Sequence, residues 1–216
     1  MKNVIVLDTE TTNSIEQPLC YDIGWAVVDE NCEVLKAESY AVAEIFLDKE
    51  LMTSAYYAEK LPKYWDDIKA GNRKLARLAT VLKTLREDIT AYGVTEIYAH
   101  NARFDDLSTK LSERYLTASK YRYFFPKSVT ICDTLKMARA TFGKDENYIK
   151  FCFDNGFVTK HKQPRARLTA EVLHRYLTND LTFEEEHQGL ADVLIEKDIL
   201  KACLARGCEG LALWAK

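Results

Sequence analysis

The sequence predicts an α/β fold, in which helices flank a mixed five-stranded sheet. Three strand-like segments, 4–10, 21–28 and 33–42, follow one another with short turns, which indicates an antiparallel meander. Apolar residues at helical spacing over 75–89 then lead to another strand-like segment at 96–100. A strand, a long helix and a strand form a crossover unit, so the later strands are expected to run parallel to the first.

The composition indicates one globular unit. The chain has 216 residues, of which 47% are hydrophobic, and this is enough for one substantial core. The net charge of −3 argues against a protein that coats duplex nucleic acid, but it allows an enzyme that contacts a few nucleotides. Because we find no repeat, low-complexity tract or linker, residues 1–216 are predicted to form a single domain.

The cysteines and the N-terminus indicate the compartment. None of the six cysteines belongs to a C-x-x-C pair, and most sit in apolar stretches, as expected for a reduced cytosolic protein. The chain begins directly with a strand, and no apolar run approaches the length of a membrane span. We therefore expect a soluble, cytoplasmic protein.

The first strand ends in two carboxylates. Its apolar part, 4–7, is dominated by β-branched residues and is typical of a buried strand, and Asp8 and Glu10 follow two positions apart. Side chains alternate along a strand, so both carboxylates point to the same side. Two like charges at the end of a buried strand need a cation or a proton, and a pair of hard divalent cations is one answer. A strand that simply exits into solvent at Asp8 is the alternative.

The other elements follow from apolar spacing and stop residues. The crowded segment 47–72 is interpreted as two short helices that cover one side of the sheet. The basic loop 160–167 either contacts phosphates or carries solvated charge, and the aromatic run 121–125 either stacks bases or belongs to the core. The remaining expected elements are strands at 96–100 and 129–132, and helices at 75–89, 105–115, 135–143, 149–153, 168–177 and from 183–187 to about 205.

Two later stretches place polar side chains where they can join the first pair. The stretch 99–106 (AHNARFDD) directly follows a strand predicted to be parallel to the first. Both sets of carboxylates therefore lie at the carboxyl ends of strands, where open α/β sheets put their active sites. The second stretch is 187–192 (HQGLAD), near the start of the last helix.

These three motifs, in this order, resemble the DEDD superfamily of 3′→5′ exonucleases. The resemblance is to the branch with a histidine as its fifth residue, DEDDh, which includes the proofreading subunit of bacterial DNA polymerase III and ribonuclease T. The motifs are 8–12 (DTETT), His100-Asn101 with Phe104-Asp105, and His187 with Asp192. The family has a ribonuclease H-like fold, which agrees with the predicted meander and α/β units.

The resemblance implies a metal-dependent 3′→5′ exonuclease. It would release nucleoside 5′-monophosphates from the 3′ end of single-stranded nucleic acid, with DNA as the first expectation. An RNA-trimming exoribonuclease and a non-catalytic nucleic-acid-binding relative are the alternatives. The implied partners are the nucleic-acid 3′ end and a polymerase or another replication or repair protein, with no membrane.

The resemblance also assigns roles to residues. Two Mg²⁺ or Mn²⁺ ions would be held by Asp8, Glu10, Asp105 and Asp192, and His187 would be the general base. Asp106 is the rival of Asp105, which we prefer because the family's acid directly follows the phenylalanine. Asp133 either supports the site or caps a helix. Substrate contacts would come from Thr11, Thr12, Asn101 and Phe104.

The chemistry favours the same residues without the family. Two divalent ions roughly 3.5–4 Å apart serve both ends of an in-line phosphodiester displacement, and a histidine can accept the proton of the attacking water. Residues five apart on an ideal helix point about 140° away from each other. His187 and Asp192 can therefore face one site only if the histidine lies in a loop or in the first turn.

Two features depart from the family. Asn13 stands where the family often has glycine, although asparagine tolerates the left-handed backbone conformation. The segment 47–72 matches nothing in the family and leaves the choice of substrate open.

Overall fold

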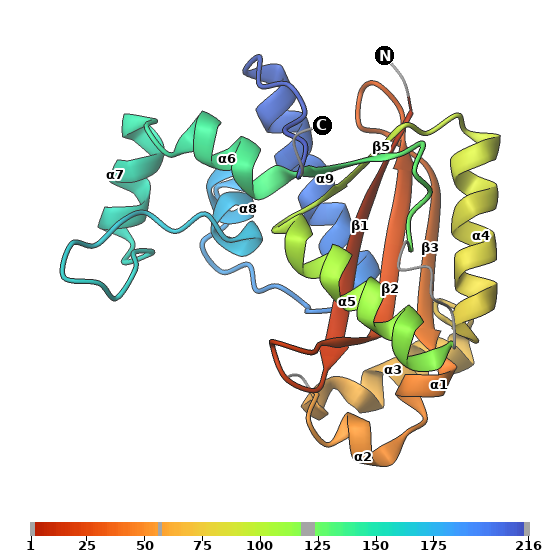
Figure 1. Ribbon diagram of the computed structural model, residues 1–216. Helices are drawn as coiled ribbons and strands as arrows, with labels where there is room; N and C mark the ends of the chain where they lie inside the picture. Colours follow the sequence, from red (N-terminus) through yellow and green to blue (C-terminus); the bar gives the residue numbers. More distant parts are fainter. Residues whose placement is uncertain (1–2, 56–57, 118–123, 214–216) are drawn as a thin grey trace.

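A six-stranded mixed sheet forms the centre of the molecule in the computed structural model, which describes residues 3–55, 58–117 and 124–213 (Figure 1). The strand order is β4-β3-β2-β1-β5-β6. The β1–β2 and β2–β3 pairs are antiparallel, and the other pairs are parallel. The strands are β1 (Val4–Thr12), β2 (Leu19–Val28), β3 (Val34–Val42), β4 (Lys74–Ala76), β5 (Glu96–Ala99) and β6 (Thr130–Asp133).

The predicted α/β fold and mixed sheet are confirmed, with one strand more than the five expected. The additional strand, β4, pairs in parallel with β3, where Leu75 lies opposite Ala41. Residue 75 therefore belongs to the sheet, and the following helix, α4, begins only at Leu78. Arg77, with ψ 148°, still has extended backbone geometry. A three-residue strand has too few side chains to be distinguished from the apolar spacing of the helix that follows it.

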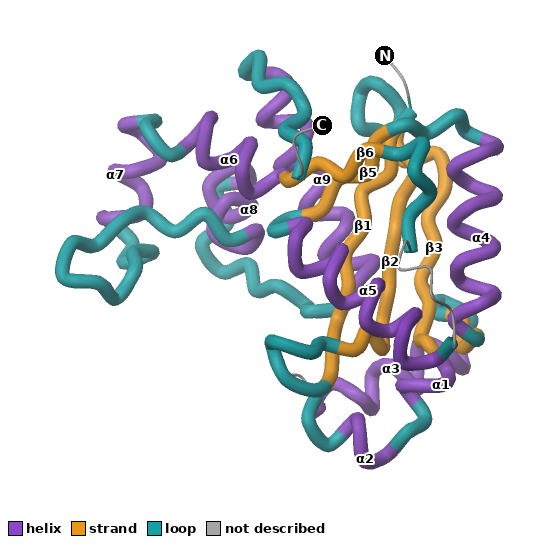
Figure 2. The backbone as a smooth tube through the Cα atoms, viewed as in Figure 1, coloured by secondary structure: helices purple, strands orange, loops and turns teal. Residues whose placement is uncertain are grey.

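Helices lie on both faces of the sheet (Figure 2), and each face has its own apolar core. Side chains alternate along β1, so Ile5 and Leu7 pack on the face covered by α4 and α5, whereas Val6 packs on the face covered by α9. The helices α6, α7 and α8 extend this second layer. The helices after β4 are α4 (Leu78–Ala91), α5 (Ala102–Leu116), α6 (Thr134–Phe142), α7 (Glu146–Asp154), α8 (Ala170–Thr178) and α9 (Gly189–Ala205).

The segment that we expected to form two helices on one side of the sheet is arranged differently. The segment 47–72 contains α2 (Lys49–Met52), the 3₁₀-helix η1 (Ala58–Lys60) and α3 (Leu61–Ala70), and α1 (Ala43–Phe46) directly precedes it. These helices gather at the end of the sheet where β1 stops (Figure 1). Thr12, the last residue of β1, bonds to the Ser54 hydroxyl at 2.9 Å and to the Leu51 carbonyl. Asn13 adopts the left-handed conformation expected at this turn, with φ 72°.

Two glycines bring α9 against the sheet. A Cβ atom on Gly24 of β2 would lie 2.2 Å from the Leu190 nitrogen, and one on Gly189 would lie 2.7 Å from the Gly24 nitrogen. Side chains at these positions would push the first turn of α9 away from β1 and β2. The two glycines therefore fix the distance between the carboxylates of β1 and the start of α9.

Several smaller expectations are tested by the described residues. All six cysteines are free, and all except Cys208 are buried, as expected for small apolar side chains. Phe124 and Phe125 belong to the core, and residues 121–123 lie outside the described part of the chain. None of the described helices is both long and apolar enough to cross a membrane.

Candidate active site

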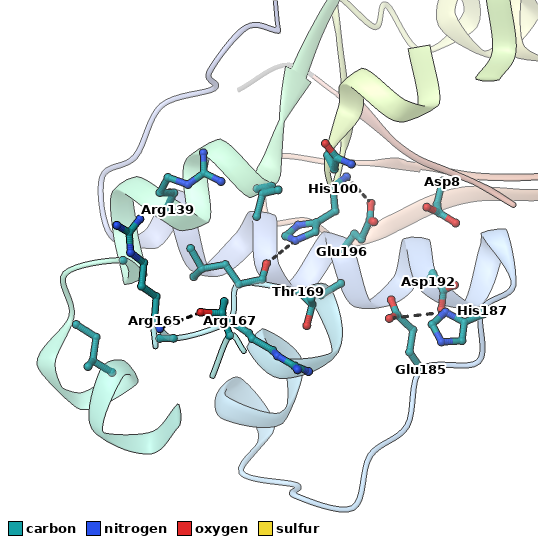
Figure 3. Close-up of a pocket in the computed structure, with 18 of the residues that line it drawn as sticks. Asp8, His100, Arg139, Arg165, Arg167, Thr169, Glu185, His187, Asp192 and Glu196 are labelled. Carbon is teal, nitrogen blue, oxygen red and sulfur yellow. Dashed lines mark hydrogen bonds and ion pairs between the residues drawn. The ribbon is translucent and has the colours of Figure 1, made fainter. Parts of the chain in front are cut away.

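Carboxylates and an imidazole from three separate segments line one cavity of about 1050 Å³, which we call the site cavity (Figure 3). Asp8 and Glu10 come from β1, and Asp192 comes from the first turn of α9. His187 reaches the cavity from the loop before α9. A ligand atom of Glu10, one of His187 and one of Asp192 all lie within 4.8 Å of one another. The structure thus brings together residues that are far apart in the sequence.

Asp105 joins this group from the other side of β1. Its carboxylate accepts a hydrogen bond from the Thr9 hydroxyl at 2.8 Å, and the residue is 4% exposed. It is not among the residues that line the site cavity, yet its charge raises the pKa of Asp8. Asp106 instead forms an ion pair with Lys110 along α5 at 2.6 Å. Of the two rivals, Asp105 is the one whose charge reaches the cluster.

Burial and mutual repulsion raise the pKa values of these carboxyl groups. Burial raises the pKa of Asp8 well above its usual range, and the charges of Glu196 and Asp105 raise it further. Burial, with the nearby charges of Asp192 and Asp22, raises the pKa of Glu10 to about 9. The pKa of Asp192 rises to about 8 for the same two reasons, first burial and then the charge of Glu185.

The cluster has the ligands that a hard divalent cation requires. Asp192 is 3% exposed, and its Oδ1 is buried without a hydrogen-bond partner among the described residues, while Oδ2 accepts from the Gln188 N–H at 2.9 Å. A buried carboxylate oxygen without a partner is costly, and a cation would satisfy it. The other possible ligands are carboxylate oxygens and one imidazole, a set that suits Mg²⁺ or Mn²⁺. The residues present therefore fit such ions.

The pH dependence of stability tests the carboxylate cluster. Unfolded carboxyl groups titrate near pH 4, whereas folded Asp192 and Glu10 titrate near 8 and 9. Between the pKa of the unfolded carboxyl groups and the raised pKa values of the folded ones, the native state holds protons that the unfolded chain has released. The free energy of unfolding therefore falls as the pH rises. We expect this fall in EDTA, measured by thermal unfolding from pH 5 to about 9, and a shallower slope in saturating Mg²⁺. Equal slopes in the two buffers would contradict the cluster's role as a cation site.

His187 lies outside the final helix, as helical geometry requires. The helix begins at Gly189, two residues later than the latest expected start, and His187 has a left-handed backbone with φ 51°. Burial lowers the pKa of His187, and the positive charge of Lys60 lowers it further. A lowered pKa keeps the imidazole neutral at neutral pH, which is the form that accepts a proton.

The segment around η1 and α3 holds the loop on the N-terminal side of His187. The Lys60 ammonium donates to the Glu186 carbonyl at 2.6 Å, and Lys63 forms an ion pair with the Glu186 carboxylate. The part of the chain that resembles nothing in the family therefore contacts the residue directly before the histidine.

A buried ion pair holds the other side of the loop. The Arg73 guanidinium pairs with the Asp22 carboxylate and lies 3.4 Å from the Gln188 Oε1. Asp22 also accepts the Gly189 N–H at 2.9 Å and the Tyr64 hydroxyl at 2.8 Å. These bonds tie β2, α3 and the first residue of α9 together and fix the backbone directly after His187.

Replacing Lys60 with glutamine is expected to raise the pKa of His187, because the ammonium charge that lowers this pKa is removed. NMR titration of the His187 imidazole in wild type and variant measures the change. Lys69→Gln on α3, where Lys69 faces Asp66 in solvent, is the matched control and should leave the titration unchanged. An unchanged His187 pKa in Lys60→Gln would remove Lys60 from this role.

Two acidic residues that line the site cavity, Glu185 and Glu196, are not among the site residues predicted from the sequence. Glu196 lies four residues after Asp192 on α9, which places both on one helix face, and this spacing was the available signal. It is 3% exposed and accepts the His100 N–H at 3.2 Å. Glu185 lies 3.9 Å from the His187 Nδ1. It belongs to a run of three acids, 184–186, which by composition favours a helix N-terminus, but α9 begins four residues after Glu185.

The expected substrate-contacting residues separate into two groups. Asn101 lines the site cavity, with φ 71°, and its N–H donates to Asp133 at 3.2 Å. Thr11, Thr12 and Phe104 are not among the lining residues. Asp133 also accepts the Leu135 N–H at 2.9 Å as the N-cap of α6, so it both caps the helix and anchors Asn101.

The fold is similar to those of solved exonuclease structures. The chain superposes on the nuclease domain of 3'hExo, a DEDDh family member bound to rAMP, with a TM-score of 0.68 and 14% identity, covering 100% of this chain and 98% of that domain. A 3'-exonuclease with 3'-end specific recognition of the histone mRNA stem-loop gives a TM-score of 0.67 at 12% identity, over 97% of this chain and 84% of that one.

A third similar structure binds DNA. E. coli exonuclease I in complex with a dT13 oligonucleotide gives a TM-score of 0.62 at 16% identity. The alignment covers 95% of this chain but only 42% of exonuclease I, so this chain spans less than half of that enzyme. No protein-family model matches the sequence, and no curated protein matches it either. Because the sequence identities are 12–16%, the structural similarity establishes the fold of this chain alone.

Proposed function

We propose that this protein is a metal-dependent 3′→5′ exonuclease that releases nucleoside 5′-monophosphates from single-stranded nucleic acid, with DNA as the first candidate. The observation that carries the proposal is that Asp8, Glu10, His187 and Asp192 meet in one cavity. Residues 1–216 would form a single exonuclease domain. Similar folds bound to rAMP, to an mRNA stem-loop and to dT13 support a nucleic-acid substrate.

The residues of the cavity have separate roles in this proposal. Asp8, Glu10 and Asp192, supported by Asp105 beneath β1, would hold two Mg²⁺ or Mn²⁺ ions. Such ions, when bound, supply charge stabilisation for the attacking and leaving oxygens of the phosphodiester. Asn101, at the cavity wall, would contact the substrate. Three residues would stabilise the neighbouring site residues without lining the cavity: Thr11, Thr12 and Phe104.

His187 would accept the proton of the attacking water. Its neutral form is favoured by burial and by Lys60. The loop geometry presents the ring to the same cavity as the β1 carboxylates, without placing the histidine in a helix. The Glu185 carboxylate, 3.9 Å away, would stabilise the imidazolium that forms.

Release of mononucleotides from labelled single strands tests the function. We expect release with Mg²⁺ or Mn²⁺ and none with EDTA, in parallel reactions on DNA and RNA. Faster release from RNA would favour the exoribonuclease alternative, which the RNA bound by similar folds supports. Binding without release from either substrate would establish the non-catalytic alternative. A replication or repair partner and a cytoplasmic location remain predictions.

A further inference from the structure

The site cavity is divided by charge. Its acidic end holds Asp8, Glu10, Glu185, Asp192 and Glu196. The opposite end is lined by three arginines, Arg139 from α6 and Arg165 and Arg167 from the loop before α8. Figure 3 shows Arg139 and Arg165 at the end of the cavity far from Asp8 and Asp192. Arg167 lies between these two arginines and the acidic end. The cavity therefore has an anionic end and a cationic end.

The three guanidiniums are available to a ligand. All three arginines are exposed, and none of them forms an ion pair with the residues that the structure describes. The polar contact of the Arg167 side chain is a hydrogen bond from Nε to the Val158 carbonyl at 3.1 Å. On a chain with net charge −3, three unpaired cations gathered at one cavity indicate an anionic ligand.

The loop that carries two of the arginines has a defined backbone. Residues 158 and 166 form an antiparallel bridge, flanked by the Thr159 N–H bond to the Arg165 carbonyl at 2.9 Å and the Arg167 N–H bond to the Phe157 carbonyl at 3.0 Å. The Tyr148 hydroxyl of α7 donates to the Arg167 carbonyl. The positions of Arg165 and Arg167 are therefore fixed relative to α7.

Apolar side chains line the site cavity as well. Phe153, which is 50% exposed, lines it together with Ile149, Leu135 and Pro164. Cations and an exposed aromatic ring that line the same cavity are typical of sites that bind single strands, in which phosphates contact the cations and a base stacks on the ring. The volume of about 1050 Å³ slightly exceeds the roughly 300–1000 Å³ found for small-ligand sites, which favours more than one nucleotide.

We propose that the cationic end binds the strand upstream of the 3′-terminal nucleotide. Its phosphates contact Arg139, Arg165 and Arg167, and a base stacks on Phe153. This inference rests on the proposed function, because the terminal nucleotide is taken to lie at the carboxylates. Those carboxylates repel a polyanion, so the arginines supply the attraction that keeps the strand in the cavity. The ligand is a single-stranded nucleic acid of several nucleotides.

The test compares a long and a short substrate. The variant Arg139→Gln/Arg165→Gln/Arg167→Gln and the wild type are assayed for binding of a fluorescent oligonucleotide in EDTA and for hydrolysis of the p-nitrophenyl ester of thymidine 5′-monophosphate. We expect weaker oligonucleotide binding and a slope of log K against log salt that is smaller by about 2, at about 0.7 per single-strand phosphate contact. Hydrolysis of the short ester should stay at the wild-type rate.

A second variant separates the cavity from the general charge of the loop. Lys160→Gln/Lys162→Gln removes two cations from the same loop at positions that do not line the site cavity. Its affinity and salt slope should match the wild type, whereas Arg165→Gln/Arg167→Gln should lose about 1.4 in slope at about 0.7 per contact. Equal losses in the two double variants, or no loss in the arginine variants, would overturn the inference.

The two proposals fail in different ways. If the wild type hydrolyses neither the oligonucleotide nor the ester with Mn²⁺, the proposed nuclease function is wrong, while the binding comparison still decides the role of the arginines. If the wild type hydrolyses both and the arginine variants bind like the wild type, the nuclease function holds and the cationic strand site is wrong.

Discussion

Replacing Asp8 with alanine is expected to abolish nuclease activity and to raise the melting temperature of the metal-free protein. Asp8 is half-buried, and the charges of Glu196 and Asp105 repel its carboxylate, so its removal relieves repulsion when no cation is present. Each 1 kcal/mol of relief raises the melting temperature by about 2–4 °C in a domain of this size. The variant should also lose most of the stabilisation that Mn²⁺ gives the native state. Thermal unfolding with and without Mn²⁺ measures both effects.

Asp106→Ala is the matched control for this experiment. Asp106 follows Asp105 directly but forms an ion pair with Lys110 along α5. Its replacement should lower the melting temperature and leave the Mn²⁺-dependent increase intact. If Mn²⁺ raised the melting temperatures of Asp8→Ala and the wild type equally, Asp8 would have no role in metal binding.

Replacing His187 with alanine is expected to lower turnover by about 10²–10⁴-fold, the usual contribution of a general base. This corresponds to roughly 3–5 kcal/mol of barrier at 1.36 kcal/mol per tenfold. Oligonucleotide and Mn²⁺ affinities should stay close to wild type, because the proposed ligands are carboxylates. Steady-state kinetics together with Mn²⁺ titration separate the two effects. Wild-type turnover from the folded variant would remove the histidine from the mechanism.

The acidic limb of the pH profile gives a second test of His187. A protonated imidazole cannot act as a base, so wild-type activity should fall as the pH drops through the pKa of His187, which burial and Lys60 hold below its usual range. This limb should be altered in His187→Ala. A limb that is set by the ion would move when Mn²⁺ replaces Mg²⁺, whereas a limb set by the imidazole would stay in place.

A large loss of Mn²⁺ affinity in His187→Ala would assign the histidine a different role. A ligand atom of His187 lies within 4.8 Å of ligand atoms of both Glu10 and Asp192. In that case the imidazole would be a metal ligand, and the base would have to be sought elsewhere in the cavity.

Local sequence signals predicted most of the sheet. Short polar turns between the strand-like segments predicted the antiparallel meander. A long apolar helical pattern predicted that β5 runs parallel to β1, and the strand pairing confirms both. Strand alternation also placed Asp8 and Glu10 on one side of β1, where both line the cavity. These features depend on residues close together in the chain, which is why periodicity reveals them.

The parts that were missed depend on contacts between distant residues. The bonds from Lys60 and Lys63 to Glu186 span more than 120 positions, so no local pattern predicts that η1 and α3 hold the histidine loop. Arg73 and Asp22 likewise pair across 51 positions. Glu196 could have been found from its spacing to Asp192, but a glutamate on an apolar helix has many roles.

The late start of α9 has a similar cause. Glu184, Glu185 and Glu186 favour a helix N-terminus by composition. Bonds from Lys60 and Lys63 hold the backbone and side chain of Glu186, and the close approach of Gly189 to Gly24 sets where the helix begins. Tertiary contacts therefore overrode the local preference.

The polarity of digestion is the most direct test of the central claim. A single-stranded oligonucleotide labelled at its 5′ end is incubated with the protein and Mn²⁺, and the products are resolved on a denaturing gel. The account predicts a ladder of labelled fragments that shorten one nucleotide at a time from the 3′ end, with unlabelled nucleoside 5′-monophosphates as the other product. Immediate release of the label as a mononucleotide, or digestion that continues in EDTA, would contradict it.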